Sequence, residues 1–374
     1  SRPMRKTLGL EQPERAIGLA AHDFAFLASQ PEVLLTRAQK SEGAPTIPSR
    51  WLQRLIQLTR GLDLEQSLAC DDDHAAFAGF LTEPPYEPPI PAPAPTPPVA
   101  VRPRILSVTE IETWLRDPYA IYARHILKLR PLDELEEEIG PLERGNAVHR
   151  ALELFVGKYP GALPDNAVQE LIAIADKVFA DIPKSTLALW RPRFLSAASW
   201  FVDLERARRT RIVESHLEVK GRRKFPGPQG EFTLTCRADR IDRLKSRGGA
   251  IIDYKTGEPP SIKQVRELLA PQLPLEGAIL GTGGFADIGA LAPEELAYLR
   301  FSGGRNPGEQ RDIPDVRALS EKAAEQLIQR IAAFDREETP YRPRVRPWRA
   351  DVAGDYDHLA RVREWSLTGW GEEE

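Results

Sequence analysis

The sequence has few cysteines and no long apolar run. Only Cys70 and Cys236 occur among its 374 residues, which excludes a disulfide framework, a four-thiolate zinc site and an iron–sulfur cluster. So low a cysteine content is typical of the reducing cytosol, and we expect a cytoplasmic location. No stretch approaches the roughly 20 apolar residues that a membrane-spanning helix needs, so we expect no membrane partner.

Several motifs of common enzyme classes are absent as well. The sequence has no GxxxxGK[ST] loop, so we expect no ATP hydrolysis by this chain alone. It also has no GxSxG nucleophile elbow and no HExxH zinc motif. Its 51 lysines and arginines and 55 aspartates and glutamates give a formal net charge of −4, which neither demands nor excludes a nucleic-acid partner. Binding of that kind depends on local charge.

Proline is the residue in excess, and the excess is concentrated in one segment. Ten of the 34 prolines lie between Pro84 and Pro103. So many missing backbone donors disfavour helix and sheet and favour a polyproline II linker, with an ordered strap across the surface as the alternative. We therefore predict three parts: a first segment at 1–83, a linker at 84–103 and a large domain at 104–374.

The first segment carries signals for only a few elements. The sequence predicts helices at Ala16–Ala28 and Ser49–Leu64, with a buried strand at Glu32–Thr36 between them. Some 80 residues are few for an independent core. Ser1 is not a natural initiator, so we expect a truncated chain that begins in the remnant of a larger domain.

The large domain shows helix signals first and strand signals afterwards, which predicts a mixed α/β fold with helices gathered ahead of a sheet. A capping-box pattern at Ser107 predicts a helix that continues to about Leu129. The other predicted helices are Glu143–Lys158, Asn166–Ala180, Ala188–Arg211, Ile262–Leu269 and Val316–Phe334. The predicted strands are His216–Lys220, Glu231–Asp239, Ala250–Tyr254 and Ala297–Phe301.

The most informative stretch is CRADRIDRLKSRGGAIIDYKTG, residues 236–257. A hairpin there brings the carboxylates of Asp239 and Asp253 together. Asp253 and Lys255 are two residues apart and so share one face of an extended strand. Paired carboxylates hold Mg²⁺ or Mn²⁺ through oxygen, and an adjacent ammonium offsets the charge that grows on a phosphate. This pattern favours metal-assisted phosphodiester hydrolysis over a merely solvated strand.

Other residues are weaker candidates when each is taken alone. Asp242 competes with Asp239 for the second carboxylate but is better suited to a turn or a structural salt bridge. His149 on its helix offers a nitrogen ligand, although a lone helix histidine is more often structural. Glu218 offers another carboxylate, although a strand glutamate is usually solvated. Gln272 offers a hydrogen bond to a reacting phosphate.

Two arginine-rich runs offer phosphate contacts. They are Arg206–Arg211 (RARRTR) and Arg342–Arg349 (RPRVRPWR), the second with Trp348 for base stacking. A solvated face is the more common explanation of such a run, so DNA contact stays open for each.

Four motifs, taken in order, resemble those of a known family. RGNAVHRALE, CRADRID, IIDYKTG and PQL look like the motifs of RecB-type nucleases of the PD-(D/E)XK superfamily. The resemblance covers about residues 104–374 and is closer still to the nuclease-containing C-terminal part of the AddB family of helicase–nuclease subunits. Residues 15–65 are similar to the end of the helicase-like region of that family.

This resemblance implies a fold, an activity and a set of roles. The fold is a PD-(D/E)XK restriction-endonuclease-like core, a mixed central sheet flanked by helices and preceded by a short helicase-like fragment. His149, Asp239 and Asp253 become metal ligands, Lys255 the catalytic lysine and Gln272 a further catalytic residue. The implied activity is Mg²⁺- or Mn²⁺-dependent exonucleolytic cleavage of DNA single strands and duplex ends. It takes place beside an AddA-like helicase–nuclease subunit, in double-strand-break repair and recombination.

The sequence departs from the family pattern at two places. Many members carry an iron–sulfur staple, whose first cysteine corresponds to Asp117 here, and the tail at Tyr341–Glu364 has no cysteine. We therefore expect no iron–sulfur cluster and other contacts between the ends of the domain. The family often has tyrosine four residues after the glutamine, where this chain has Glu276. Two alternatives stay open: a catalytically idle DNA-binding scaffold subunit and a stand-alone RecB-family exonuclease.

Overall fold

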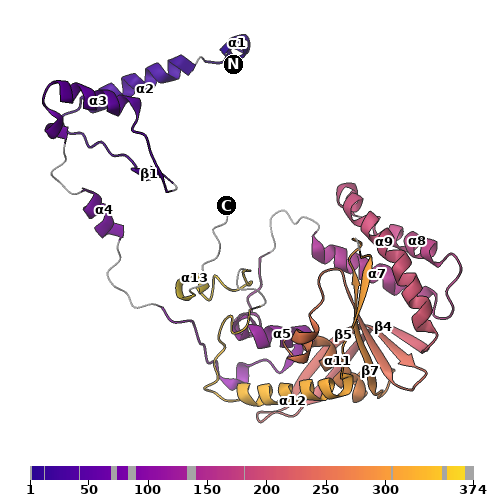
Figure 1. Cartoon of the computed structure of the whole chain (residues 1–374). Coiled ribbons are helices and arrows are strands. Elements are labelled where there is room, and N and C mark those ends of the chain that lie inside the picture. Colours follow the sequence, from indigo (N-terminus) through magenta and orange to yellow (C-terminus); the bar gives the residue numbers. More distant parts are fainter. Residues whose placement is uncertain are drawn as a thin grey trace. The chain divides into compact units, whose positions relative to one another are not determined.

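The computed structural model divides into two compact units, Ser1–Pro88 and Pro89–Glu374 (Figure 1). The residues it describes are 2–11, 13–41, 43–68, 74–82, 90–132, 140–180, 182–304, 306–347 and 352–366. The domain boundaries predicted from the sequence stay predictions. Within the described ranges, no helix has both the length and the apolar character needed to cross a membrane.

The first unit consists of short elements without a core. They are α1 (Arg2–Thr7), α2 (Pro13–Ala28), β1 (Lys40–Ser41), β2 (Ala44–Pro45), α3 (Arg50–Gly61), a 3₁₀ turn (Glu65–Leu68) and α4 (His74–Thr82). The two predicted helices are confirmed as α2 and α3, and the Ser49 hydroxyl caps α3 by accepting from the Leu52 amide at 3.2 Å. None of the described residues in this unit is buried.

The predicted strand at Glu32–Thr36 is wrong. These residues are exposed and form no strand, and no other strand of the described chain pairs with them. An apolar run becomes a strand only when a neighbour satisfies its backbone groups and a core covers its side chains. The first unit supplies neither.

Residues 90–103 belong to the second unit and are hydrogen-bonded to other parts of it. The Tyr341 amide donates to the Pro95 carbonyl at 2.9 Å. The guanidinium of Arg102 donates to carbonyls at the C-terminal end of α12 (Val316–Phe334), those of Phe334, Arg336 and Glu337. Because carbonyls at a helix end lack intrahelical donors, Arg102 both satisfies them and fastens this segment. The described part of the proline-rich segment is thus a surface strap, and residues 83–89 lie outside the described ranges.

The helix predicted from Ser107 to Leu129 is shorter and divided. Its capping box is confirmed, since Ser107 and Glu110 cap each other at the start of α5 (Val108–Arg116). The helix stops at Asp117 because Pro118 cannot donate a backbone hydrogen bond and restricts the residue before it. Asp117 then caps α6 (Pro118–Ile121), which continues as a π-helical turn at Tyr122–Ile126.

A six-stranded mixed sheet forms the centre of the second unit. Its strands are β3 (Ile105–Ser107), β4 (Ile212–Phe225), β5 (Phe232–Leu244), β6 (Gly249–Lys255), β7 (Pro293–Phe301) and β8 (Gly308–Asp312). β4 pairs antiparallel along the length of β5, while β3 and β6 pair with separate parts of β5. The remaining order is β6–β7–β8, with β6 and β7 parallel. The sheet was predicted in outline, but β3 and β8 were not.

Helices cover the two faces of this sheet (Figure 1). On one face α5, α11 (Gln272–Gly281) and α12 form the α11 core, and on the other α7 (Pro141–Lys158), α8 (Ala167–Val178) and α9 (Lys184–Arg209) form the α9 core. Ile251 and Leu296 face the α11 core, while the next residues, Ile252 and Ala297, face the α9 core. The central strands are therefore buried on both faces. The remaining short elements are a 3₁₀ turn (Val99–Val101), α10 (Ile262–Arg266) and α13 (Val362–Trp365).

The long β4–β5 hairpin changes face in its middle. Leu217 packs against the α9 core, whereas Val219 packs against the α11 core. In a regular strand, residues i and i+2 share a face, so the backbone turns between these two residues. Glu218 makes the turn with a φ of 52°, in the left-handed region that non-glycine residues seldom occupy.

Candidate active site

Asp239 and Asp253 meet where two strands part. The pairing of β5 with β6 ends at Arg240 and Ile252, and the next residues along the two strands are these aspartates. Beyond that point the Tyr254 amide donates to Asp239 Oδ2 at 2.8 Å instead of continuing the ladder. The separated strand ends leave room for carboxylates that would otherwise be confined between paired backbones.

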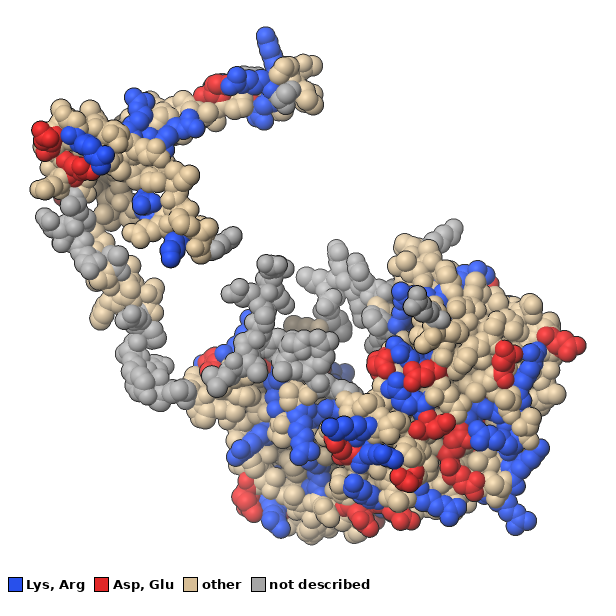
Figure 2. Space-filling model, in the orientation of Figure 1, with Lys and Arg blue, Asp and Glu red and all other residues tan. Residues whose placement is uncertain are grey.

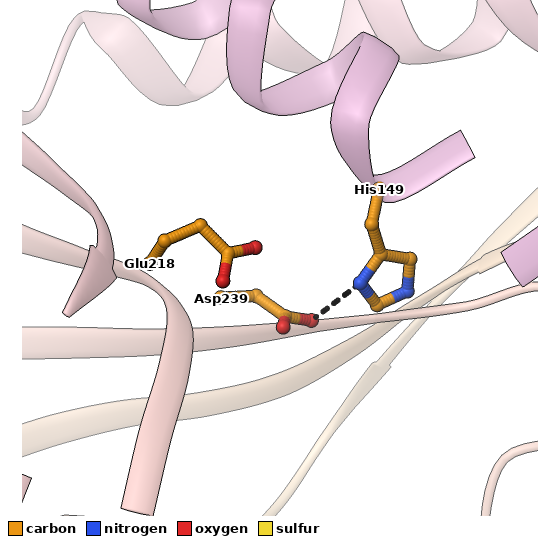
Figure 3. A group of neighbouring side chains, drawn as sticks. All are labelled: His149, Glu218 and Asp239. Carbon is orange, nitrogen blue, oxygen red and sulfur yellow. Dashed lines mark ion pairs between the residues drawn. The ribbon is translucent and has the colours of Figure 1, made fainter. Parts of the chain in front are cut away.

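His149, Glu218 and Asp239 form one group of potential metal ligands (Figure 3). One ligand atom from each residue lies within 4.8 Å of those of the other two. His149 comes from α7, and its Nδ1 lies 3.4 Å from Asp239 Oδ2. The edge of the imidazole meets the Tyr254 ring at a centroid distance of 5.9 Å, which fixes the ring further. In Figure 3 the three side chains converge from the helix and the two hairpin strands.

Glu218 is the member of this group that sequence reasoning left as a minor candidate. It lies opposite Asp239, between the register pairs Leu217–Arg240 and Val219–Ala238. Its carboxylate also forms an ion pair with Arg237, whose Nε lies 2.6 Å from Glu218 Oε2. Counting the register outward from the hairpin turn would have placed Glu218 beside Asp239. Its left-handed backbone, however, gives no signal in the sequence.

Asp253 lies with the lysine and the glutamine rather than in the three-residue group. Lys255 Nζ donates to Asp253 Oδ1 at 3.1 Å and lies 2.8 Å from Oδ2. Gln272, the first residue of α11, donates from Nε2 to the same Oδ1 at 2.8 Å. The roles of these residues, and of Asp253 as a metal ligand, stay predictions. What the structure brings together is a carboxylate, an ammonium and an amide around one point.

Glu276 stands one helical turn beyond Gln272 and is only 1% exposed. Gln272 Nε2 donates to its Oε1 at 3.3 Å. Burial, followed by the charges of Asp253 and Asp239, holds the pKa of Glu276 well above its ordinary value. The residue that departs from the family pattern is therefore part of the support behind Gln272, and it does not reach solvent.

Burial and neighbouring charges shift the pKa values of the ionisable residues at the site. Burial raises the pKa of Asp253 against the opposing charge of Lys255, and burial together with the charge of Asp239 raises the pKa of Glu218. Burial lowers the pKa of Lys255, but the charge and hydrogen bond of Asp253 outweigh it, so that pKa lies above the ordinary value. Crowded carboxylates whose ionised forms are disfavoured attract a cation.

Asp242, the competing carboxylate, belongs to a buried structural network. Arg240 donates to Asp242 at 2.6 Å and to Glu205 of α9 at 2.5 Å, and all three side chains are inaccessible to solvent. Arg208 of α9 and Ser215 of β4 also donate to Asp242, at 3.2 and 2.7 Å. These contacts hold the hairpin on α9, and Asp242 is not a member of the ligand group.

The residues present fit a divalent metal ion. The group offers one imidazole and two carboxylates, a donor set that suits Mg²⁺ or Mn²⁺. Close by, Asp253 Oδ2 is buried without a hydrogen-bond donor of suitable geometry in the described chain. A cation would satisfy that oxygen and relieve the repulsion among the acids.

A comparison with protein families identifies the domain. Residues 105–346 match the model of the PD-(D/E)XK nuclease superfamily, and this range includes all four motifs and the site built from them. The chain belongs to the PD-(D/E)XK nuclease superfamily. Its mixed sheet, flanked by helices on both faces, has the architecture expected of that superfamily.

The curated relatives of this nuclease domain are longer than the chain. It is 28% identical to an uncharacterized protein of Rickettsia bellii over 340 residues, covering 86% of this chain and 38% of that protein. It is also 28% identical to an uncharacterized protein of Rickettsia conorii, covering 82% of this chain and 36% of that protein. The chain thus spans less than two-fifths of these relatives. Among solved structures, the crystal structure of SSO0001 matches with 12% identity and a TM-score of 0.26, covering 68% of this chain and 82% of that one.

The first arginine-rich run proves largely structural. Arg208 is buried between Asp242 and Glu295, and Arg209 bonds Glu205 and two loop carbonyls. These two side chains are therefore not free to bind DNA. In the second run Arg344 pairs with Asp357, and Trp348 and Arg349 lie outside the described residues.

Proposed function

We propose that this nuclease domain is a divalent-metal-dependent DNA exonuclease module of an AddB-like helicase–nuclease subunit. The observation that carries the proposal is the convergence of His149, Glu218 and Asp239 beside the Asp253–Lys255 pair. The ordered motifs support the AddB-like part, as do longer relatives that leave room for a motor region in the same chain. The cellular role that follows is processing of DNA ends in double-strand-break repair, beside an AddA-like partner.

The metal group would be held by His149, Glu218 and Asp239, with Asp253 as the further carboxylate. When bound, Mg²⁺ or Mn²⁺ acidifies a water molecule and neutralises charge on the phosphate under attack. Asp239 orients the imidazole of His149 through the 3.4 Å contact at Nδ1. The remaining nitrogen, Nε2, is then directed away from that carboxylate.

Lys255 supplies fixed positive charge next to the metal group. Asp253 holds its ammonium at 2.8 Å, and the raised pKa keeps the side chain protonated at neutral pH. From there it donates hydrogen bonds to a phosphate oxygen or to the attacking water, where charge develops in the transition state. Gln272 fixes Asp253 from the other side, so the lysine and its carboxylate stay aligned before substrate arrives.

The test is cleavage of end-labelled single-stranded DNA with Mg²⁺, Mn²⁺ or EDTA, for the wild-type chain and its Asp239→Asn variant. We expect metal-dependent cleavage that the substitution reduces by at least about 100-fold. The matched control is Asp312→Asn at an exposed strand aspartate, which we expect to cleave normally. Circular single strands should survive if the activity is exonucleolytic. Cleavage that persists in EDTA or in Asp239→Asn would contradict the proposal.

A further inference from the structure

One face of the hairpin next to the site is bare. Beyond the turn at Glu218, Val219 and Phe225 pack on the α11 core, and Arg223 donates to the Ala278 carbonyl of α11 at 3.0 Å. The intervening residues Lys220, Arg222 and Lys224 therefore point to the opposite face. All three side chains are exposed there.

The neighbouring strand extends this face. In the register of the hairpin, Arg237 lies opposite Lys220, Thr235 opposite Arg222 and Thr233 opposite Lys224. We call Lys220, Arg222, Lys224 and Arg237 the basic strip. Thr233 adds a hydroxyl beside it, whereas the Thr235 hydroxyl donates to the Leu106 carbonyl at 3.4 Å.

Much of the positive charge in the strip is not neutralised. Lys220 and Arg222 have no ion-pair partner in the described part of the chain. Lys224 pairs with Glu231, but both side chains are 65% exposed, so the pair is weak and easily exchanged. The face of the nuclease unit seen in Figure 2 shows lysines and arginines interspersed with acidic side chains. A run of cations along one bare strand contrasts with that mixture.

The strip leads directly into the candidate active site. Arg237 Nε lies 2.6 Å from Glu218 Oε2, and Glu218 is one of the three grouped ligands. Side chains on one strand face repeat every two residues, about 6.8 Å along the strand. The cations therefore form a regular row that ends at the metal group.

We propose that the basic strip binds the sugar–phosphate backbone of a single nucleic-acid strand and guides it to the His149–Glu218–Asp239 group. The inference rests on the proposed nuclease function and adds the path of the substrate. Regularly spaced, exposed cations suit a chain of phosphates. The continuity through Arg237 shows why a strand held there would arrive at the ligand group.

The test measures binding without cleavage. A fluorescein-labelled oligothymidylate is titrated with the chain in EDTA, by fluorescence anisotropy, at several salt concentrations. The test variant is Lys220→Ala/Arg222→Ala. The matched control is Arg317→Ala/Lys322→Ala, which removes one exposed arginine and one exposed lysine from α12, on the α11 side of the sheet. A charge-retaining exchange, Lys220→Arg/Arg222→Lys, shows whether charge alone is needed.

We expect the test variant to bind on the order of tenfold more weakly at 0.1 M salt. Its plot of log affinity against log salt should be shallower by about 1.4, since each lost single-strand phosphate contact removes about 0.7. The control and the charge-retaining exchange should bind like the wild type. Equal weakening in the control variant, an unchanged salt slope or no binding by the wild type would overturn the inference. Displacement by polyglutamate as efficient as by unlabelled oligonucleotide would also overturn it, because the strip would then bind any polyanion rather than a sugar–phosphate backbone.

The outcomes separate this inference from the proposed function. If the test variant binds and cleaves normally while Asp239→Asn is inactive, the role proposed for the basic strip is contradicted and the nuclease assignment is supported. If the wild type binds the oligonucleotide without cleaving it, and the test variant binds it more weakly, the role of the basic strip is supported and the nuclease assignment fails.

Discussion

Leu217 and Val219 stand two residues apart on β4 yet pack into different hydrophobic cores. The left-handed Glu218 between them turns the strand and at the same point contributes a carboxylate to the ligand group. Backbone strain at a residue with a chemical role is a recurring feature of active sites. Beyond this turn lie the exposed side chains of the basic strip.

Replacing Glu218 should separate its chemical role from its backbone strain. Glu218→Gly and Glu218→Ala both remove the carboxylate, and we expect both to lose metal affinity and cleavage. Because only glycine tolerates a φ of 52° freely, Glu218→Gly should be more stable than Glu218→Ala by about 1 kcal/mol. Denaturant unfolding of the two variants measures this difference. The opposite order, which is usual for a strand, would show that the turn does not strain the chain.

Asp117 should stabilise the domain without serving catalysis. Its Oδ1 accepts from the Ala120 amide at 3.2 Å, and its carboxylate also accepts from the backbone of Arg344. Arg344 in turn pairs with Asp357, so these contacts tie α6 to the C-terminal segment. We expect Asp117→Ala to lower the free energy of unfolding by about 1–2 kcal/mol and to leave cleavage nearly unchanged.

The control for Asp117→Ala is Asp355→Ala, since Asp355 is exposed and lies 3.8 Å from Arg124. Its melting temperature should match that of the wild type. Equal melting temperatures for both variants and the wild type would show that Asp117 does not join the ends of the domain.

Asp242 should make the domain sensitive to acid. Burial raises its pKa, but the charges of Arg240 and Arg208 outweigh burial, so the folded-state pKa lies below the ordinary 3.8. The stabilisation is therefore present above pH 3.8 and is lost as the pH falls through the lower, folded-state pKa. At neutral pH, Asp242→Asn removes the negative charge beside two buried arginines. We expect the free energy of unfolding to fall by about 3–5 kcal/mol.

Urea unfolding of the wild type and Asp242→Asn between neutral and strongly acidic pH provides the measurement. The difference in unfolding free energy between the two should shrink toward the acidic end, because the wild-type carboxyl becomes neutral as well. The exposed Asp312→Asn variant should follow the wild type throughout. A difference that stays constant with pH would mean that Asp242 is not held ionised by the arginines.

Glu276 should act by positioning Gln272. Gln272 Nε2 donates to Asp253 at 2.8 Å and to Glu276 at 3.3 Å, so two acceptors fix the amide. Glu276→Gln retains an acceptor and should keep kcat within about threefold. Glu276→Leu removes it and should lower kcat about tenfold or more with little change in KM, because Asp253 loses its alignment. An increase in KM with kcat unchanged would instead indicate a role in binding DNA.

The sequence predicted the mixed α/β fold and the Asp253–Lys255 pair because both depend on local pattern. The hairpin brings Asp239 to Asp253, Asp253 and Lys255 share a strand face, and the capping box at Ser107 formed as its residues indicate. The order of helices followed by strands predicted the mixed α/β domain.

What the sequence did not reveal depends on contacts between distant segments. Glu32–Thr36 reads as a strand from composition, but no neighbour pairs with it. The run at Arg206–Arg211 reads as a basic surface, but Arg208 is buried by two acids that come from other strands. Glu218 looked like a solvated strand residue because a left-handed φ inside a strand has no sequence signal.

The most direct test of the nuclease assignment is a comparison of Mn²⁺ binding and DNA cleavage in the wild type and in Lys255→Ala. The Lys255 side chain is 33% exposed and belongs to neither hydrophobic core, so the variant should fold normally. Because His149, Glu218 and Asp239 remain, Mn²⁺ should bind with about wild-type affinity, measured by electron paramagnetic resonance. Cleavage of end-labelled single-stranded DNA should fall by about 100-fold or more. Unchanged cleavage in Lys255→Ala would contradict the account.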